Sequence, residues 1–288
     1  MVEKGIVYLH IGTKHCNHLA VSLMSLWDHY DGDVCLITCG EAADEFTTQY
    51  LMAEQRFGRR LFHYHQKQPP GRAYYAKTHL GDWSPFEKTV FLDSDTLIIG
   101  SIEDVFPDNE EEVKLTCFAD WKTNERPVKG RILVWDDVLP KLVAAMSYHP
   151  YPAINTGVMG FSKGSRRFLT EWKRATSKKP KQFIADEITA QLIFPQFPHQ
   201  IMSDRWNASP KHSLAKRGVK TLEAAKEQDY RVIHGHGLSF YKSGKLGQDF
   251  WLPYYARAID ENWYGIREWT QKLGKVPHDY IERLKVET

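Results

Sequence analysis

Short apolar runs alternate with amphipathic segments in the first third of the chain. Residues 5–11 (GIVYLHI) are rich in β-branched and aromatic side chains, which predicts a strand, and residues 18–30 carry leucines and a tryptophan at helical spacing. The same alternation predicts further strands at residues 33–38, 60–65 and 89–92 and helices at residues 41–57 and 74–80. Elements in this order are typical of βαβ units and a mostly parallel sheet.

The second half of the chain is less regular. It predicts strands at residues 114–118, 157–161 and 232–236, and helices at residues 139–146, 166–175, 186–194, 262–273 and 279–285. A long polar and aromatic stretch, residues 120–152, separates the first two of these strands. Because no repeat, low-complexity segment or linker interrupts the chain, we expect one α/β domain over residues 1–250 and a helical extension over residues 251–288 packed on it.

Composition excludes some classes of protein. Hydrophobic residues make up 42% of the 288 residues and charged residues 26%, which indicates a folded core rather than disorder. The formal net charge of +2 is too small to mark a polyanion-binding protein by itself. The four cysteines form no CxxC pair, so buried thiols are expected rather than a zinc site. No apolar run is long enough to span a bilayer, so we expect a soluble, cytoplasmic protein.

Two carboxylates stand one residue apart inside an otherwise apolar stretch, KTVFLDSDTLII. Asp93 follows a predicted strand, and ligands of open α/β sheets collect beyond the carboxyl ends of strands. With Asp95 it offers only oxygen ligands, which suit a hard divalent cation. A solvated turn in which the aspartates accept hydrogen bonds from nearby backbone N–H groups is the simpler interpretation.

Two enzyme classes use such a pair. A haloacid-dehalogenase-type phosphatase has the pattern DxDxT near its first strand, but here Thr96 comes one residue early and the motif lies far into the chain. A nucleotide-sugar transferase uses a DxD element to hold a metal on the donor diphosphate. The second class also predicts a third metal ligand further along the chain and polar residues that hold the sugar.

A long block, residues 73–106 (AYYAKTHLGDWSPFEKTVFLDSDTLIIGSIEDVF), resembles the family eight glycosyltransferases, glycogenin and its bacterial galactosyl- and glucosyltransferase relatives. The resemblance implies the GT-A fold, a Rossmann-like, open and mostly parallel sheet flanked by helices. It also implies that Lys77 contacts the nucleotide-sugar donor and that Asp93, Ser94 and Asp95 form its DxD motif, in which the two aspartates bind the metal.

Further blocks follow in the order of the family. INTGVMGF (residues 154–161) resembles the strand whose asparagine contacts the donor sugar, here Asn155. ADEITAQLIF (residues 185–194) resembles the helix start that lines the reaction centre; Asp186 matches it, and Glu187 stands where the family often has glutamine. VIHGHG (residues 232–237) resembles the terminal segment that supplies the third metal ligand, His234, with His236 as the alternative.

The ends of the resemblance are weaker. The first strand implies Ile11, Gly12 and His15 near the nucleotide base, and RWN (residues 205–207) resembles a short element of the family. The closing KPW motif is missing, and its nearest substitute at the diphosphate is Tyr241-Lys242; Gly237, at the end of the VIHGHG block, is also expected to contact the donor. In all, the resemblance covers about residues 5–245.

The resemblance implies transfer of a sugar from a UDP-sugar to an acceptor hydroxyl with retention, assisted by Mn²⁺ or Mg²⁺. Glu187 or Asp186 would be the catalytic carboxylate, although acids also stabilise helix N-termini. A saccharide, a protein or a modified nucleic-acid base, such as a hydroxymethylated base in phage-type DNA, could be the acceptor. Basic clusters at residues 177–181 and at Lys211–Lys220 favour phosphate contacts, or are simply solvated loops. The alternative function is a non-catalytic protein that binds nucleotide sugars.

Overall fold

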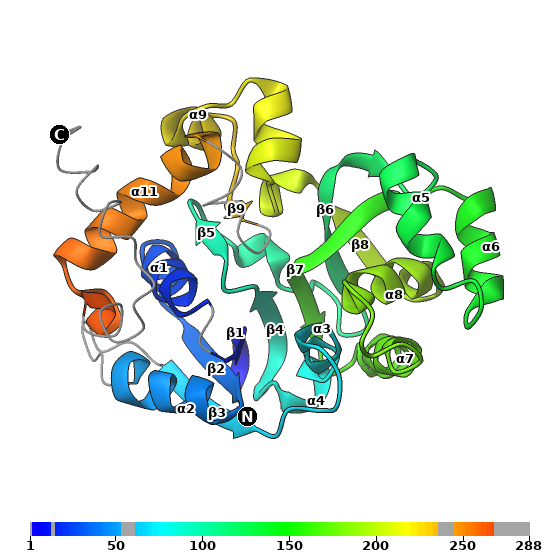
Figure 1. Ribbon diagram of the computed structural model, residues 1–288, viewed down its shortest axis with the longest axis horizontal. Helices are drawn as coiled ribbons and strands as arrows, with labels where there is room; N and C mark the ends of the chain where they lie inside the picture. Colours follow the sequence, from blue (N-terminus) through cyan, green and yellow to red (C-terminus); the bar gives the residue numbers. More distant parts are fainter. Residues whose placement is uncertain (1, 13–14, 53–60, 236–244, 268–288) are drawn as a thin grey trace.

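A seven-stranded sheet forms the centre of the molecule, with its strands in the order β3-β2-β1-β4-β7-β6-β8 (Figure 1). The structure, a computed structural model, describes residues 2–12, 15–52, 61–235 and 245–267. The strands are β1 (Val2–Ile11), β2 (Asp33–Cys39), β3 (Leu61–Gln66), β4 (Phe86–Leu92), β6 (Val113–Lys122), β7 (Pro152–Ser162) and β8 (His199–Met202).

The sheet is open and mostly parallel, as predicted. β1 pairs in parallel with β2 and β4, β2 with β3, and β6 with β8, whereas β7 runs antiparallel to both β4 and β6. Because β7 is reversed, its first residues lie at the same edge as the last residues of β1, β4, β6 and β8. Because β2 and β3 run parallel to β1, all seven strands bring an end to this edge.

Helices cover both faces of the sheet (Figure 1). Alternation along β1 separates the two faces, because Ile6 and Tyr8 belong to one buried cluster and Val7 to the other. The first cluster is closed by α1, α9 and α11, and the second by α4 to α8. Among the described residues the helices are α1 (Cys16–Trp27), α2 (Glu41–Phe46), α3 (Ala73–Lys77), α4 (Leu80–Trp83), α5 (Arg126–Leu133), α6 (Pro140–Tyr148), α7 (Arg166–Thr176), α8 (Ala185–Ile193), α9 (Leu222–Glu227) and α11 (Lys245–Asp260).

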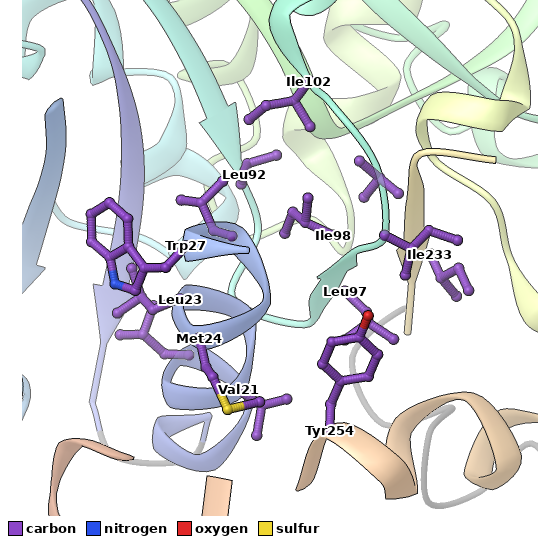
Figure 2. Packing of buried hydrophobic residues seen from close by; sticks show 14 of the residues in the cluster. Val21, Leu23, Met24, Trp27, Leu92, Leu97, Ile98, Ile102, Ile233 and Tyr254 are labelled. Carbon is purple, nitrogen blue, oxygen red and sulfur yellow. The ribbon is translucent and has the colours of Figure 1, made fainter. Parts of the chain in front are cut away.

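A small second sheet ties the end of the fold to its beginning. β5 (Thr96–Ile98) pairs antiparallel with β9 (Val232–His234). Figure 2 shows Leu97 and Ile233 from these strands packed among side chains of α1 and Tyr254 of α11. Thr96 is the register partner of His234, so this packing brings two distant parts of the chain together beside Asp95.

Several predicted elements differ from the structure. The expected helix at residues 41–57 is α-helical only to Phe46 and continues as a π-helical turn, Thr47–Leu51. The expected helix at residues 74–80 is split into α3 and α4. Of the helix expected at residues 262–273, the described part is mostly a 3₁₀ turn at Trp263–Gly265, and the one expected at residues 279–285 lies outside the described residues.

Other elements were not predicted. α5 lies in the irregular stretch, and β6 and β7 extend into it; the buried face of α5 consists of little more than Val128 and Ile132, too short a pattern to recognise. α11 contains Pro253, which interrupts the helical pattern, and it crosses residue 250, where the domain boundary stays a prediction. No helix in the described ranges combines the length and apolar character needed to cross a bilayer.

Candidate active site

Two carboxylates and an imidazole meet at the carboxyl edge of the sheet. Asp93, Asp95 and His234 place one ligand atom each within 4.8 Å of one another. The His234 Nε2 lies 3.1 Å from Asp95 Oδ1 and 3.7 Å from Asp93 Oδ2. The backbone fixes both aspartates, because Asp93 N donates to the Gly157 carbonyl over 2.7 Å and Gly235 N donates to the Asp95 carbonyl over 2.8 Å. The structure thus brings together the three residues predicted to bind a metal.

Asn207 orients the imidazole. Its side-chain amide donates to Thr116 Oγ1 over 2.7 Å, which leaves its Oδ1, 2.8 Å from His234 Nδ1, as an acceptor. Nδ1 therefore carries a proton, and in the neutral ring the lone pair of Nε2 faces the two aspartates. Hydrogen bonds of this kind to the second ring nitrogen are typical of histidines that bind metals.

The protonation of His234 opposes cation binding. Burial lowers the pKa of His234, but the carboxylates of Asp95 and Asp93 outweigh burial and raise the pKa overall. A cation must displace the proton on Nε2, so metal affinity should fall at acidic pH. The donor set fits Mn²⁺ or Mg²⁺, since it offers carboxylate oxygens and one imidazole nitrogen and leaves positions for the oxygens of a diphosphate.

Lys77 connects the candidate metal ligands Asp93, Asp95 and His234 to helix α8. Its Nζ lies 2.9 Å from Asp93 Oδ1 and 3.1 Å from Asp186 Oδ2, and its side chain is buried. Burial lowers the pKa of Lys77, yet the two carboxylates reverse that effect and raise the pKa, so the ammonium stays charged. The lysine predicted to contact the donor is thus placed at the metal cluster, where its charge would favour a diphosphate.

Asn155 connects the imidazole network to Glu187. The Asn155 Nδ2 donates to Glu187 Oε2 over 2.7 Å, and its Oδ1 accepts from Gly157 N over 2.8 Å and from Asn207 Nδ2 over 3.1 Å. On its other side Glu187 faces Arg131, with 3.4 Å between Oε1 and NH1. Burial and the charge of Asp186 raise the pKa of Glu187 to about 7, although Arg131 opposes the shift.

The two candidate catalytic carboxylates differ in their surroundings. The Asp186 side chain is only 3% exposed and binds Lys77 and Thr156, whereas that of Glu187 is 16% exposed and lines a small cavity. The residue Ile184 precedes their helix in the left-handed region at φ 48°, a strained conformation for a β-branched side chain. This geometry favours Glu187 as the carboxylate that reaches a substrate and Asp186 as its support.

The remaining predicted residues either lie near the site or fall outside the described residues. Ile11 ends β1, and the pairing of Tyr8 with Leu92 puts the end of β1 at the same sheet edge as Asp93. Gly12 has φ of +66° with open space around its Cα, and His15 precedes helix α1. Ser94 is half-buried between the two aspartates. Gly237, Lys242 and the alternative ligand His236 lie outside the described residues.

Several site residues were given no role from the sequence. Asn207 was noted only as part of a short family element, and nothing in its local sequence shows that it binds an imidazole. Thr116, which accepts from Asn207, lies inside a predicted strand. Arg131 and Trp121 come from the irregular stretch, which offered no motif. Asn207 follows the 3₁₀ turn Asp204–Trp206, so no predicted strand end marked it in the sequence.

By sequence, no family model and no curated protein matches the chain. Solved structures do match. The galactosyltransferase LgtC, in complex with donor and acceptor sugar analogues, superposes with a TM-score of 0.52 at 13% identity, over 80% of this chain and 86% of its own. Mouse xyloside xylosyltransferase 1 superposes with a TM-score of 0.51 at 14% identity, over 82% of this chain and 98% of its own. The bifunctional glycosyltransferase WbbM superposes with a TM-score of 0.56 at 14% identity, over 81% of this chain and 45% of its own.

The chain has the GT-A glycosyltransferase fold. Within this GT-A fold the candidate metal ligands and Glu187 share the sheet edge where open α/β sheets bind ligands. The fold prediction is thereby confirmed.

Proposed function

We propose that this protein is a metal-dependent glycosyltransferase that moves a sugar from a UDP-sugar to an acceptor hydroxyl with retention of anomeric configuration. One observation carries the proposal. Asp93, Asp95 and His234 converge at the ligand edge of a GT-A sheet, with the imidazole oriented by Asn207. The predicted cytoplasmic location stays a prediction.

Asp93, Asp95 and His234 would hold Mn²⁺ or Mg²⁺, and the imidazole nitrogen favours Mn²⁺. When bound, the cation would stabilise the negative charge of the leaving nucleoside diphosphate. Lys77 adds a fixed positive charge at the same place, held by Asp93 and Asp186. We assign the nucleotide to the end of β1, where Ile11, Gly12 and His15 adjoin the same sheet edge.

Glu187 is the carboxylate we assign to the reaction centre. Asn155 and Arg131 hold its two oxygens, so its orientation is fixed before the substrate binds. In its ionised form it can stabilise positive charge at the anomeric carbon or accept the proton of the acceptor hydroxyl. An active-site mutant of LgtC with glutamate in place of glutamine is among the matching structures, and Glu187 supplies a glutamate naturally.

The test is release of nucleoside diphosphate. The protein is incubated with a panel of nucleotide sugars with and without Mn²⁺, and we expect slow UDP release from a UDP-sugar that depends on the metal. Asp95→Asn should reduce release at least about tenfold because it removes a metal ligand. Asp82→Asn, at an exposed ion pair with Lys173, is the matched control and should leave release unchanged.

The same assay separates the alternative functions. A non-catalytic binding protein would retain the UDP-sugar without releasing UDP. Release that is equal with and without Mn²⁺, or equal in the Asp95→Asn variant, would contradict the metal assignment.

A further inference from the structure

Trp121 lies between an open cavity and the assigned catalytic carboxylate. It is the second-to-last residue of β6 and is half-buried. On one side it lines a cavity of about 600 Å³ together with Asp204, Arg217 and Tyr230. On the other side it lines the small cavity that contains Glu187. A molecule bound in the large cavity would therefore pass the indole of Trp121 to reach the carboxylate.

A lysine and an imidazole lie beside this indole. The Lys216 Nζ lies 5.3 Å from the centroid of the Trp121 ring, and the His212 ring lies 5.0 Å away. Burial, with the charges of Lys211, Lys216 and Arg131, lowers the pKa of His212, which indicates that these three cations come close to one imidazole. We call Arg131, Lys211 and Lys216 the basic rim.

The charge of the basic rim is largely uncompensated within the described part of the chain. Lys211 and Lys216 are exposed and form no ion pair with a described carboxylate, and the only ion pair of Arg131 is with Glu187. The charge of nearby Arg217, in contrast, is compensated, because Arg217 forms ion pairs with both Asp120 and Asp204. Like charges held together without counter-charges attract an anion.

We propose that the acceptor carries a phosphate group next to a ring, with the phosphate bound by the basic rim and the ring packed on Trp121. This inference rests on the proposed glycosyltransferase function and names the class of its acceptor. Lysine and arginine side chains bind phosphate through charge-assisted hydrogen bonds, and an aromatic face beside them gives a platform for a base or sugar ring. A neutral saccharide would gain little from Lys211 and Lys216, the two cations of the basic rim that form no ion pair with a described carboxylate.

Two sources supply this chemistry, a nucleotide within a nucleic-acid strand and a phosphorylated saccharide. In both, the hydroxyl that accepts the sugar extends from the ring past Trp121 toward Glu187. Transfer joins the acceptor oxygen to the anomeric carbon, breaks the bond from that carbon to the diphosphate, and leaves the hydroxyl proton on a base such as Glu187.

Direct binding tests the proposal. The full-length protein with Mn²⁺ and UDP is titrated by calorimetry with a single-stranded oligonucleotide, with a hexose 6-phosphate and with the unphosphorylated hexose. We expect at least one phosphate-bearing probe to bind at least about tenfold more tightly than the neutral hexose. For the oligonucleotide, a fourfold rise in salt concentration should weaken binding about 20-fold, if about three phosphates are contacted.

Charge reversal locates the site. The double variant Lys211→Glu/Lys216→Glu should weaken binding of the phosphate-bearing probe at least about tenfold. Lys178→Glu/Lys181→Glu, in the other basic cluster and equally exposed, is the matched control and should bind as the wild type does. Binding of only the oligonucleotide identifies a nucleic-acid acceptor, and binding of only the hexose phosphate identifies a phosphorylated saccharide.

The proposal is overturned if neither phosphate-bearing probe binds, if the neutral hexose binds equally well, or if charge reversal at Lys211 and Lys216 changes nothing. These outcomes are distinct from failure of the proposed function. That function fails when the wild-type protein releases no UDP from any UDP-sugar, whatever the binding titrations show.

Discussion

At the scale of single residues, Glu187 has an environment unlike that of an ordinary surface acid. Its pKa is raised to about 7, first by burial and then by Asp186, while Asn155 and Arg131 bind its two oxygens. A carboxyl group with this pKa changes charge close to neutral pH, as expected of a group that exchanges protons with a substrate.

The variant Glu187→Gln should retain donor binding and lose transfer. We expect kcat to fall at least about 100-fold, since the amide can neither accept a proton nor offset a full positive charge. In the wild type, transfer should rise with pH through about 7 as Glu187 ionises, and the variant should lack this step. Glu103→Gln, at an exposed ion pair with Lys4, is the control. Turnover near the wild-type value in Glu187→Gln would exclude the catalytic role.

The same substitution has a consequence for stability. Folding raises the pKa of Glu187 from 4.5 to about 7. The stabilisation that protonated Glu187 gives the folded state is therefore fully present below pH 4.5 and is lost as the pH rises through 7. The glutamine variant has no such loss. Its free energy of unfolding relative to wild type should therefore increase between pH 5 and pH 8, by up to about 3 kcal/mol, as measured by urea denaturation.

At the scale of elements, the close approach of β7 to β9 depends on a glycine. A Cβ added to Gly157 would lie 2.2 Å from Cε1 of His234 and 2.8 Å from Oδ1 of Asn155. Both neighbours are buried and hydrogen-bonded, so neither can move away freely. The glycine in the INTGVMGF block is thus required because the imidazole packs directly against the strand.

The variant Gly157→Ala should displace the imidazole. We expect Mn²⁺ affinity to fall about 10- to 100-fold in a calorimetric titration and the protein to lose about 1–3 kcal/mol of stability. Gly130→Ala, in α5 with open space around its Cα, is the matched control and should leave metal binding unchanged while stabilising the helix by up to about 1 kcal/mol. Unchanged Mn²⁺ affinity in Gly157→Ala would show that His234 binds no metal.

At the scale of the whole molecule, sequence patterns predicted the elements that carry a clear apolar run, including β9 within the strand expected at residues 232–236, and missed short elements such as β5. β1, β2 and β4 are buried strands and could be recognised directly. The three-residue strands β5 and β9 are stable only because each pairs with the other between α1 and α11. Their pairing brings His234 to Asp95 across more than a hundred residues, which spacing along the chain does not reveal.

The candidate site shows the same division. Asp93, Asp95, Asn155 and Glu187 were predicted because they lie within blocks that resemble a family. Asn207 acts on His234 only through the fold, and the basic rim is assembled from α5 and from the turns at residues 210–217, which meet around Trp121. Residues that orient or surround a site depend on which strands become neighbours, and local sequence does not record that.

The variant Trp251→Ala tests whether α11 belongs to the same cooperative unit as the site. Trp251 is 1% exposed, its ring lies 5.0 Å from that of His18 in α1, and it shares a buried cluster with β5 and β9. Removing it should cost about 3–5 kcal/mol in one unfolding transition, followed in urea by circular dichroism and by Mn²⁺ binding. Tyr148→Ala, which removes an aromatic ring that is 81% exposed, should change stability by less than about 0.5 kcal/mol.

If α11 instead unfolded in a separate early transition that left Mn²⁺ binding intact, it would be an independent extension. A single transition would mean that β9, and with it His234, is held in place by α11.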